Sequence, residues 1–105
     1  MKTNLKEALE RGIGIDFSEL YKWTTVNIIF EDDYHDDEVQ FDVEQLQTNK
    51  GQKELEDLFI NFLKEEDVDI SKVNVLDVVF VRTAGSYEAL MHLEAEEEGY
   101  CFIDE

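Results

Sequence analysis

The spacing of apolar residues changes along this chain, and these changes constrain its fold more than any other feature. In residues 23–44, apolar and polar positions alternate, as in strands that bury one face. A polar turn at 32–37 divides this stretch, so we predict a β-hairpin with an acidic outer face. In residues 55–63 the spacing becomes three and four, which predicts an amphipathic helix. Its apolar stripe is formed by Leu55, Leu58, Phe59, Phe62 and Leu63.

Two further segments have recognisable patterns. Residues 73–81 are rich in β-branched side chains and apolar on both faces, which is typical of a central strand. Residues 4–11 have the spacing of a short helix that ends at Gly12, and one more helical turn is expected with Asp16 or Ser18 as its cap.

The segment 87–96 fits two structures. Its alternation favours a strand, whereas its glutamate, alanine, leucine and methionine content favours a helix. We predict a strand, because the alternation is sustained and a glycine-containing turn precedes it, and we expect a last short strand at 100–103. The resulting order is α-β-β-α-β-β-β. It predicts an α+β fold with a small antiparallel sheet of about four to five strands and helices packed on one face.

Length and composition predict one folded domain over residues 1–105. The chain is 43% hydrophobic and 11% aromatic, which is enough for a core at this size. We find no apolar run long enough to span a membrane and no apolar stretch of a signal peptide near the N-terminus. Cys101 is the single cysteine, so no intramolecular disulfide can form. We therefore expect a cytoplasmic protein that does not contact membranes.

The charge is unusually negative and unevenly distributed. Nine Lys and Arg stand against 27 Asp and Glu, a net charge of −18. Residues 1–22 form a neutral, helical N-terminal segment, so the whole excess lies in residues 23–105, the expected ββαβββ body. Residues 31–44 contain eight acids and residues 94–105 six, without a Lys or Arg. Because such charges repel one another and destabilise a compact state, we expect them to serve a purpose.

The residue patterns that carry catalysis or tight metal binding are missing. His35 lies among adjacent carboxylates, but the alternate acids and the glycine of a calcium loop are absent. We therefore assign no metal site, and we leave open whether residues 31–38 attract a cation. His92 and Cys101 are surrounded by acids, which disfavour a reactive thiolate. No glycine-rich phosphate loop exists. We expect neither enzymatic activity nor a cofactor.

Acidity of this size predicts a basic partner. Direct nucleic-acid binding is disfavoured, since it rests on Lys and Arg. A domain about 33 Å across faces a stretch of duplex DNA that carries about 20 charges, which is comparable with −18. In size and charge the chain resembles the phage and mobile-element inhibitors of restriction or CRISPR nucleases. That resemblance implies an inhibitor that presents a DNA-like surface to a nucleic-acid-binding protein or nuclease. The alternatives are an immunity or antitoxin-type inhibitor of a basic toxin, and an acidic adaptor module in a cytoplasmic complex.

We expect the contact surface in the hairpin, its outer strand face and a second C-terminal patch. The neutral N-terminal segment either packs on the sheet or lets two copies form a homodimer. The predicted partner-binding residues are Asp32, Asp33, Asp36, Asp37, Glu38, Asp42, Glu44, Glu94, Glu96, Glu97 and Glu98.

Overall fold

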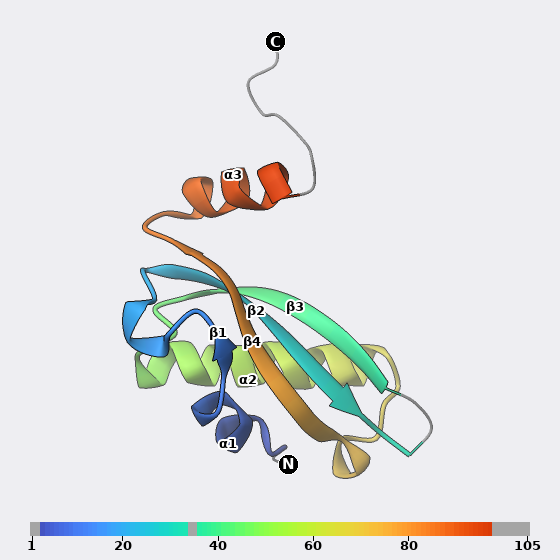
Figure 1. Cartoon of the computed structure of the whole chain (residues 1–105). Helices are drawn as coiled ribbons and strands as arrows, with labels where there is room; N and C mark the ends of the chain where they lie inside the picture. The colour runs from blue at the N-terminus through green and yellow to red at the C-terminus, as the bar shows by residue number, and fades with distance from the viewer. Residues whose placement is uncertain (1–2, 34–35, 98–105) are drawn as a thin grey trace.

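The computed structural model describes residues 3–33 and 36–97 of the chain (Figure 1). These residues form an α+β fold in which a four-stranded mixed sheet is flanked by helices, which confirms the predicted fold class. The elements are α1 (Leu5–Glu10), β1 (Ile13–Gly14), the 3-10 turn η1 (Phe17–Glu19), β2 (Trp23–Glu31), β3 (Asp36–Glu44), α2 (Asn49–Glu65), the 3-10 turn η2 (Ile70–Lys72), β4 (Asn74–Ala84) and α3 (Tyr87–Glu97).

The sheet has the strand order β1-β4-β2-β3. β2 pairs antiparallel with β3 on one side and with β4 on the other, so the predicted hairpin is confirmed. β4 lies between two strands, as its apolar residues on both faces predicted. Two irregularities interrupt the β2–β4 ladder, next to Val26 and next to Phe30.

The two-residue strand β1 is the element that the sequence did not indicate. It runs parallel to β4, and Gly14 lies opposite Phe80 with φ of +96°. A Cβ at this glycine would lie 2.6 Å from the Phe80 carbonyl oxygen, so the close approach needs glycine for both reasons. Two residues are too few to show a period, so the sequence pattern indicates only that the first helix ends at Gly12.

The long helix α2 begins at a cap that the sequence supplies. The Thr48 hydroxyl accepts a hydrogen bond from the Gly51 N–H at 3.1 Å, and Gln45 makes the preceding turn with a positive φ of 54°. Gly51 itself lies against the Gln45 carbonyl, where any Cβ would collide with the backbone. This tight junction sets α2 beneath the hairpin.

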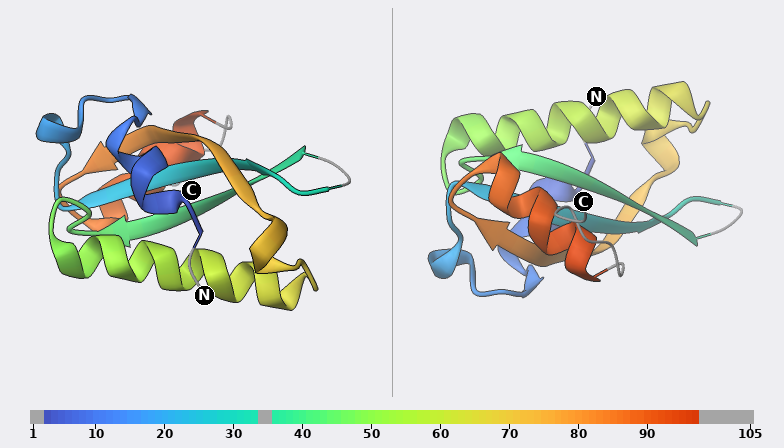
Figure 2. Two further views of the ribbon diagram at one scale, coloured as in Figure 1. Left: turned by 90° about the horizontal axis from the view of Figure 1, so that it is seen from below. Right: turned by 90° about the horizontal axis from the view of Figure 1, so that it is seen from above.

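α1 and α2 pack on one face of the sheet, as expected, and this packed face contains the main core (Figure 2). Val26, Ile28 and Phe30 of β2 point into it at period two. Phe59 of α2 is completely buried, and its ring meets that of Phe30 at 5.3 Å, edge to face.

The prediction of a strand at 87–96 is wrong, because the segment is the helix α3. Its helix-forming residues outweigh the alternation, and only Leu90 and Ala95 are buried among its described side chains. α3 contacts β4 and β2 on the face opposite to α1 and α2 (Figures 1 and 2). The strand expected at 100–103 lies outside the described residues.

No helix within residues 3–33 and 36–97 is both long enough and apolar enough to cross a membrane.

Candidate protein-binding surface

The second face of the sheet, opposite the packed face, carries side chains in regular cross-strand rows. Residues paired across neighbouring strands point to the same side, so the pairing defines each row. Two rows lie next to α3: Trp23 with Glu44 and Ala84, and Thr25 with Asp42 and Arg82. The three rows beyond them are Asn27–Gln40–Val79, Ile29–Glu38–Asp77 and Glu31–Asp36–Asn74.

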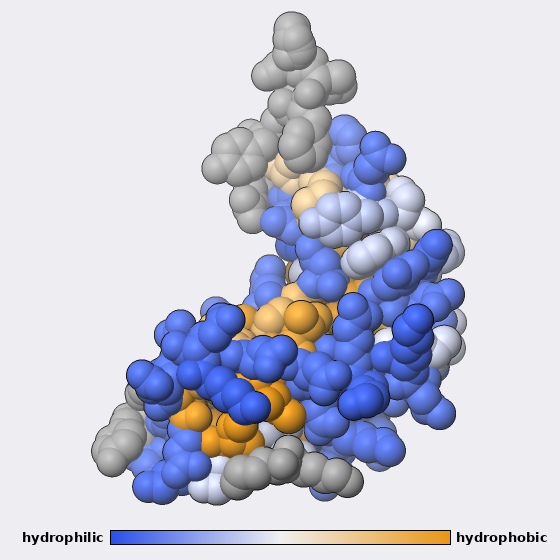
Figure 3. Space-filling view, turned by 180° about the vertical axis from the view of Figure 1, so that it is seen from behind, coloured by the Kyte–Doolittle hydropathy of each residue, from blue (hydrophilic) through white to orange (hydrophobic). Residues whose placement is uncertain are grey.

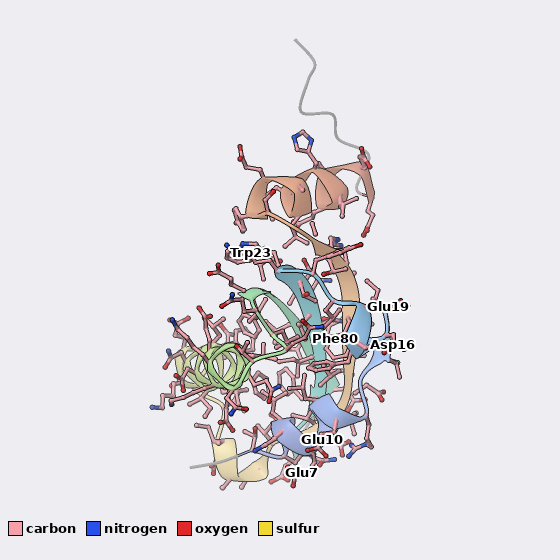
Figure 4. The ribbon with its side chains drawn as sticks, turned by 90° about the vertical axis from the view of Figure 1, so that its left-hand side faces the viewer. Glu7, Glu10, Asp16, Glu19, Trp23 and Phe80 are labelled. Atoms are coloured by element: carbon pink, nitrogen blue, oxygen red, sulfur yellow. The ribbon has the colours of Figure 1, made fainter. Side chains whose placement is uncertain are left out.

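At the α3 end, the second face is closed by packing and by ion pairs. The ring of Trp23 meets that of Tyr87 at 5.0 Å, and Figure 4 shows Trp23 at the end of the sheet beneath α3, with Phe80 in the body of the domain. Arg82 is only 7% exposed. Its Nη2 donates to Glu97 Oε1 at 2.7 Å, and its Nη1 lies 3.5 Å from Glu94 Oε2.

These contacts shift the ionisation of the pair. The hydrogen bond between Arg82 and Glu97 raises the pKa of the guanidinium, against an opposing effect of burial, and nearby carboxylates add to the rise. The same hydrogen bond lowers the pKa of Glu97. Both groups are therefore charged near neutral pH, and Arg82 compensates part of the negative charge at the α3 end of the second face.

The three outer rows carry more negative charge than the two rows next to α3. We call the nine residues of these outer rows the open face. Four of them are acids (Glu31, Asp36, Glu38 and Asp77) and none is basic. Asp36, Glu38 and Asp77 are exposed, while Ile29 and Val79 are half-buried between them. In the described part of the chain, the carboxylates of Asp36 and Asp77 make no hydrogen bond or ion pair, so their charges remain available.

The open face is shallowly concave. A hollow of about 310 Å³ is lined by Ile29, Asp36, Asp37 and Glu38. Seen from behind, a notch on one side separates the α3 end from the rest of the domain, and polar side chains cover most of the visible surface (Figure 3). This shape suits a convex partner better than a small ligand.

The predicted hairpin acids lie on or beside the open face, and several have partners there. Asp33 forms an ion pair with Lys72 at 3.2 Å. Glu38 accepts a hydrogen bond from the Asn27 amide at 2.8 Å. Asp36 and Asp37 are both exposed on β3, but Asp37 pairs with Phe30 and so lies on the packed-face side of the strand, and Asp32 is half-buried.

Towards α3 the predicted strand acids are more strongly held. Asp42 accepts a hydrogen bond from the Thr25 hydroxyl at 2.7 Å. Glu44 pairs with Lys22 at 3.3 Å, so a base from the neutral N-terminal segment reaches the acidic strand. These two carboxylates are half-buried and contribute less to an exposed field than their position in the sequence suggests.

The predicted second patch is not a row of free acids. Glu94 and Glu97 bind Arg82, which lies 12 and 15 positions earlier in the chain and is not part of the predicted patch. Glu96 is exposed on α3, and Glu98 lies outside the described residues. The structure therefore brings Asp36 and Glu38 together on the open face, and Glu94 and Glu97 help to hold α3.

Two contributors to the open face were missed. Asp77 sits inside the apolar run 73–81, and Glu31 lies at the end of β2, where its carboxylate accepts a hydrogen bond from the Asn74 amide at 3.2 Å. The signal for Asp77 was its position: an acid in a strand that is otherwise apolar on both faces marks a side that is not covered.

Two other hollows carry mixed charge. One of about 260 Å³ lies between α1 and α2, and a second of about 360 Å³ adjoins it, with Lys6, Leu9 and Gln52 common to both. Lys53 and Glu56 line the first and Glu10 the second, so neither favours one sign of charge. Among the described residues, no group of three or more His, Cys, Asp or Glu is placed to hold a metal ion.

No family model, curated protein or solved structure matches this chain. Functional inference therefore rests on the geometry and charge of the surface itself.

Proposed function

We propose that this chain is an acidic binding protein that inhibits a basic, nucleic-acid-binding protein by presenting a DNA-like negative surface. The observation that carries the proposal is the open face, where four acids and no base stand on neighbouring strands. A rigid sheet fixes these carboxylates relative to one another, so a basic partner meets an ordered array.

The magnitude of the charge supports a comparison with DNA. The longest dimension of the molecule is 46 Å, and duplex DNA of that length carries about 27 charges. The net charge of −18 is of the same order. Such a field accelerates association with a basic protein and weakens in salt.

The decisive variant removes three of the four acids of the open face, while a matched variant changes the net charge equally elsewhere. In the first, Asp36→Asn, Glu38→Gln and Asp77→Asn remove exposed acids of the open face. In the control, Glu54→Gln, Glu65→Gln and Glu66→Gln remove exposed acids from α2 and its C-terminal cap.

Both variants are compared with the unmodified protein against the partner captured by affinity purification from the native host. We expect the open-face variant to lose at least about tenfold in affinity, because it removes charges at the contact, and the control to lose much less. Equal losses would contradict the assignment to the open face, because only net charge would then matter.

Inhibition by mimicry of DNA also requires that this protein and nucleic acid compete for the same partner. The captured partner should release its nucleic acid as this protein is added, and the competition should weaken steeply as salt rises. A partner that keeps its nucleic acid bound at saturation would contradict mimicry and favour the adaptor role. A toxic basic partner that binds no nucleic acid would favour the immunity role.

A further inference from the structure

The two sides of the sheet differ in how many of their outward backbone groups are paired with other segments of the chain. The edge of β4 is occupied at several points. The Asn4 side-chain amide donates to the Val75 carbonyl at 3.0 Å and accepts from the Val75 N–H at 2.7 Å, as a neighbouring strand would. β1 pairs with Val79 and Phe80 farther along, and the Tyr21 N–H reaches the Thr83 hydroxyl at 2.7 Å.

β3 ends the sheet on the other side, and no described residue pairs with its outer edge as a strand. The Gln45 N–H donates to the Lys22 carbonyl at 2.6 Å, which makes Lys22 and Gln45 a hydrogen-bonded pair. Bonded and non-bonded pairs alternate along an antiparallel ladder. The residues of β3 whose backbone N–H and C=O point outward are therefore Asp36, Glu38, Gln40, Asp42 and Glu44.

One of these outward donors already has a local partner, since the Glu38 N–H donates to the Asp37 carboxylate at 2.8 Å. The outward groups of Gln40, Asp42 and Glu44 lie beyond it. Within residues 3–33 and 36–97, no further main-chain hydrogen bond engages these outward groups. An edge strand with unpaired main-chain groups is a template for one more strand.

Charge determines which strand fits. The five residues with outward backbone groups also place their side chains on the second face, and four of the five are acids. Side chains on an added strand would lie directly opposite them, where like charges destabilise and opposite charges stabilise. A second copy of β3 would set acid against acid, whereas a segment with Lys or Arg at every other position would be complementary.

We propose that the outer edge of β3 accepts an extended, alternately basic segment of the partner as an additional strand of the sheet. The identity of the partner rests on the proposed function, whereas the mode of binding rests on the free edge. Main-chain hydrogen bonds supply the binding geometry, and the acids of the second face select the basic side chains.

The test uses a synthetic peptide of alternating lysine and valine, about eight residues and ~27 Å long, to match β3. Gln40 is the informative position, because it is exposed, carries no charge and directs its N–H outward. Gln40→Pro removes that N–H without removing a bond to β2, and edge strands tolerate proline there. Gln40→Ala is the matched control, since it loses the same side chain but keeps the N–H.

We expect Gln40→Pro to bind the peptide about five- to tenfold more weakly than Gln40→Ala does at low salt, because both variants lose the side chain and only the proline variant loses the backbone N–H. A peptide methylated on every other backbone nitrogen should lose at least as much towards the unmodified protein, a result that does not depend on how the proline variant folds. Equal binding by both peptides, equal binding by both variants, or no peptide binding would overturn the edge proposal. The proposed function fails separately, if the open-face and α2 charge variants bind the captured partner equally.

Discussion

The two faces of the sheet differ in composition, because the packed face is apolar and the second face is partly acidic. The packed face buries β2, β4 and α2 side chains around Phe59 and Phe30, with no charged residue in the core cluster. The second face has one apolar contact region under α3 and beyond it the open face, where Ile29 and Val79 are surrounded by acids. Successive residues of the same strands therefore contribute alternately to the core and to the second face.

The packed face stabilises the folded state, whereas the open face destabilises it. Burial on the packed face supplies the hydrophobic free energy of folding. Carboxylates on the open face gain little from burial and repel one another, so they lower the stability of the folded state. Removing acids from the open face should therefore raise the free energy of unfolding, whereas truncating a core side chain should lower it.

The largest effect is expected on the packed face. Phe59→Ala should lower the free energy of unfolding by about 3–5 kcal/mol, because the ring is fully buried and leaves a cavity against Phe30. Urea denaturation followed by circular dichroism measures the change. Gln40→Ala on the exposed second face is the control and should stay within about 0.5 kcal/mol. Similar losses in both variants would contradict the division between the faces.

The α3 end should show the next largest effect. Glu94→Gln together with Glu97→Gln removes both charged partners of the buried Arg82 and should cost about 1–2 kcal/mol. Arg82→Met should cost less, because it removes the buried charge itself and leaves two carboxylates with access to water. Urea denaturation ranks the two, and a larger loss for Arg82→Met would mean that packing of the arginine stem dominates.

Most of the packed face could be predicted from the sequence, whereas the second face could not. The periods of 23–44 and 55–63 are local and identified the hairpin and α2. Arg82 holds α3 through residues 12 and 15 positions farther along the chain, and Asp77 joins the open face only through strand order. For α3, the alternation of its sequence competed with propensity, and propensity prevailed because few of its side chains are buried.

On the open face, removing charge should stabilise the protein. The variant with Asp36→Asn, Glu38→Gln and Asp77→Asn should raise the free energy of unfolding by about 1 kcal/mol at low salt, since it relieves repulsion among acids held on one face. The gain should shrink as salt screens the charges. Denaturation at two salt concentrations measures it. A loss of stability that salt does not change would indicate that these acids support the fold through local hydrogen bonds.

The smallest effect concerns pH and distinguishes the carboxylates of α3 from those of the open face. The hydrogen bond from Arg82 lowers the pKa of Glu97, so this carboxylate stabilises the folded state above its ordinary pKa of about 4.3. That contribution is lost as the pH falls through the lowered pKa of the folded state. Because the Glu97 side chain is 50% exposed, its contribution should be about 0.5 kcal/mol.

The measurement compares the unmodified protein with Glu97→Gln across this pH range. A protonated glutamate resembles glutamine, so the two proteins should differ most near neutral pH and converge in acid. Asp77→Asn is the control with the opposite sign, because Asp77 is exposed beside the other open-face acids. Near neutral pH this variant should be slightly more stable than the unmodified protein, since it removes one of the repelling charges of the open face. If both substitutions shifted stability in the same direction, the acids of α3 and of the open face would not play opposite roles.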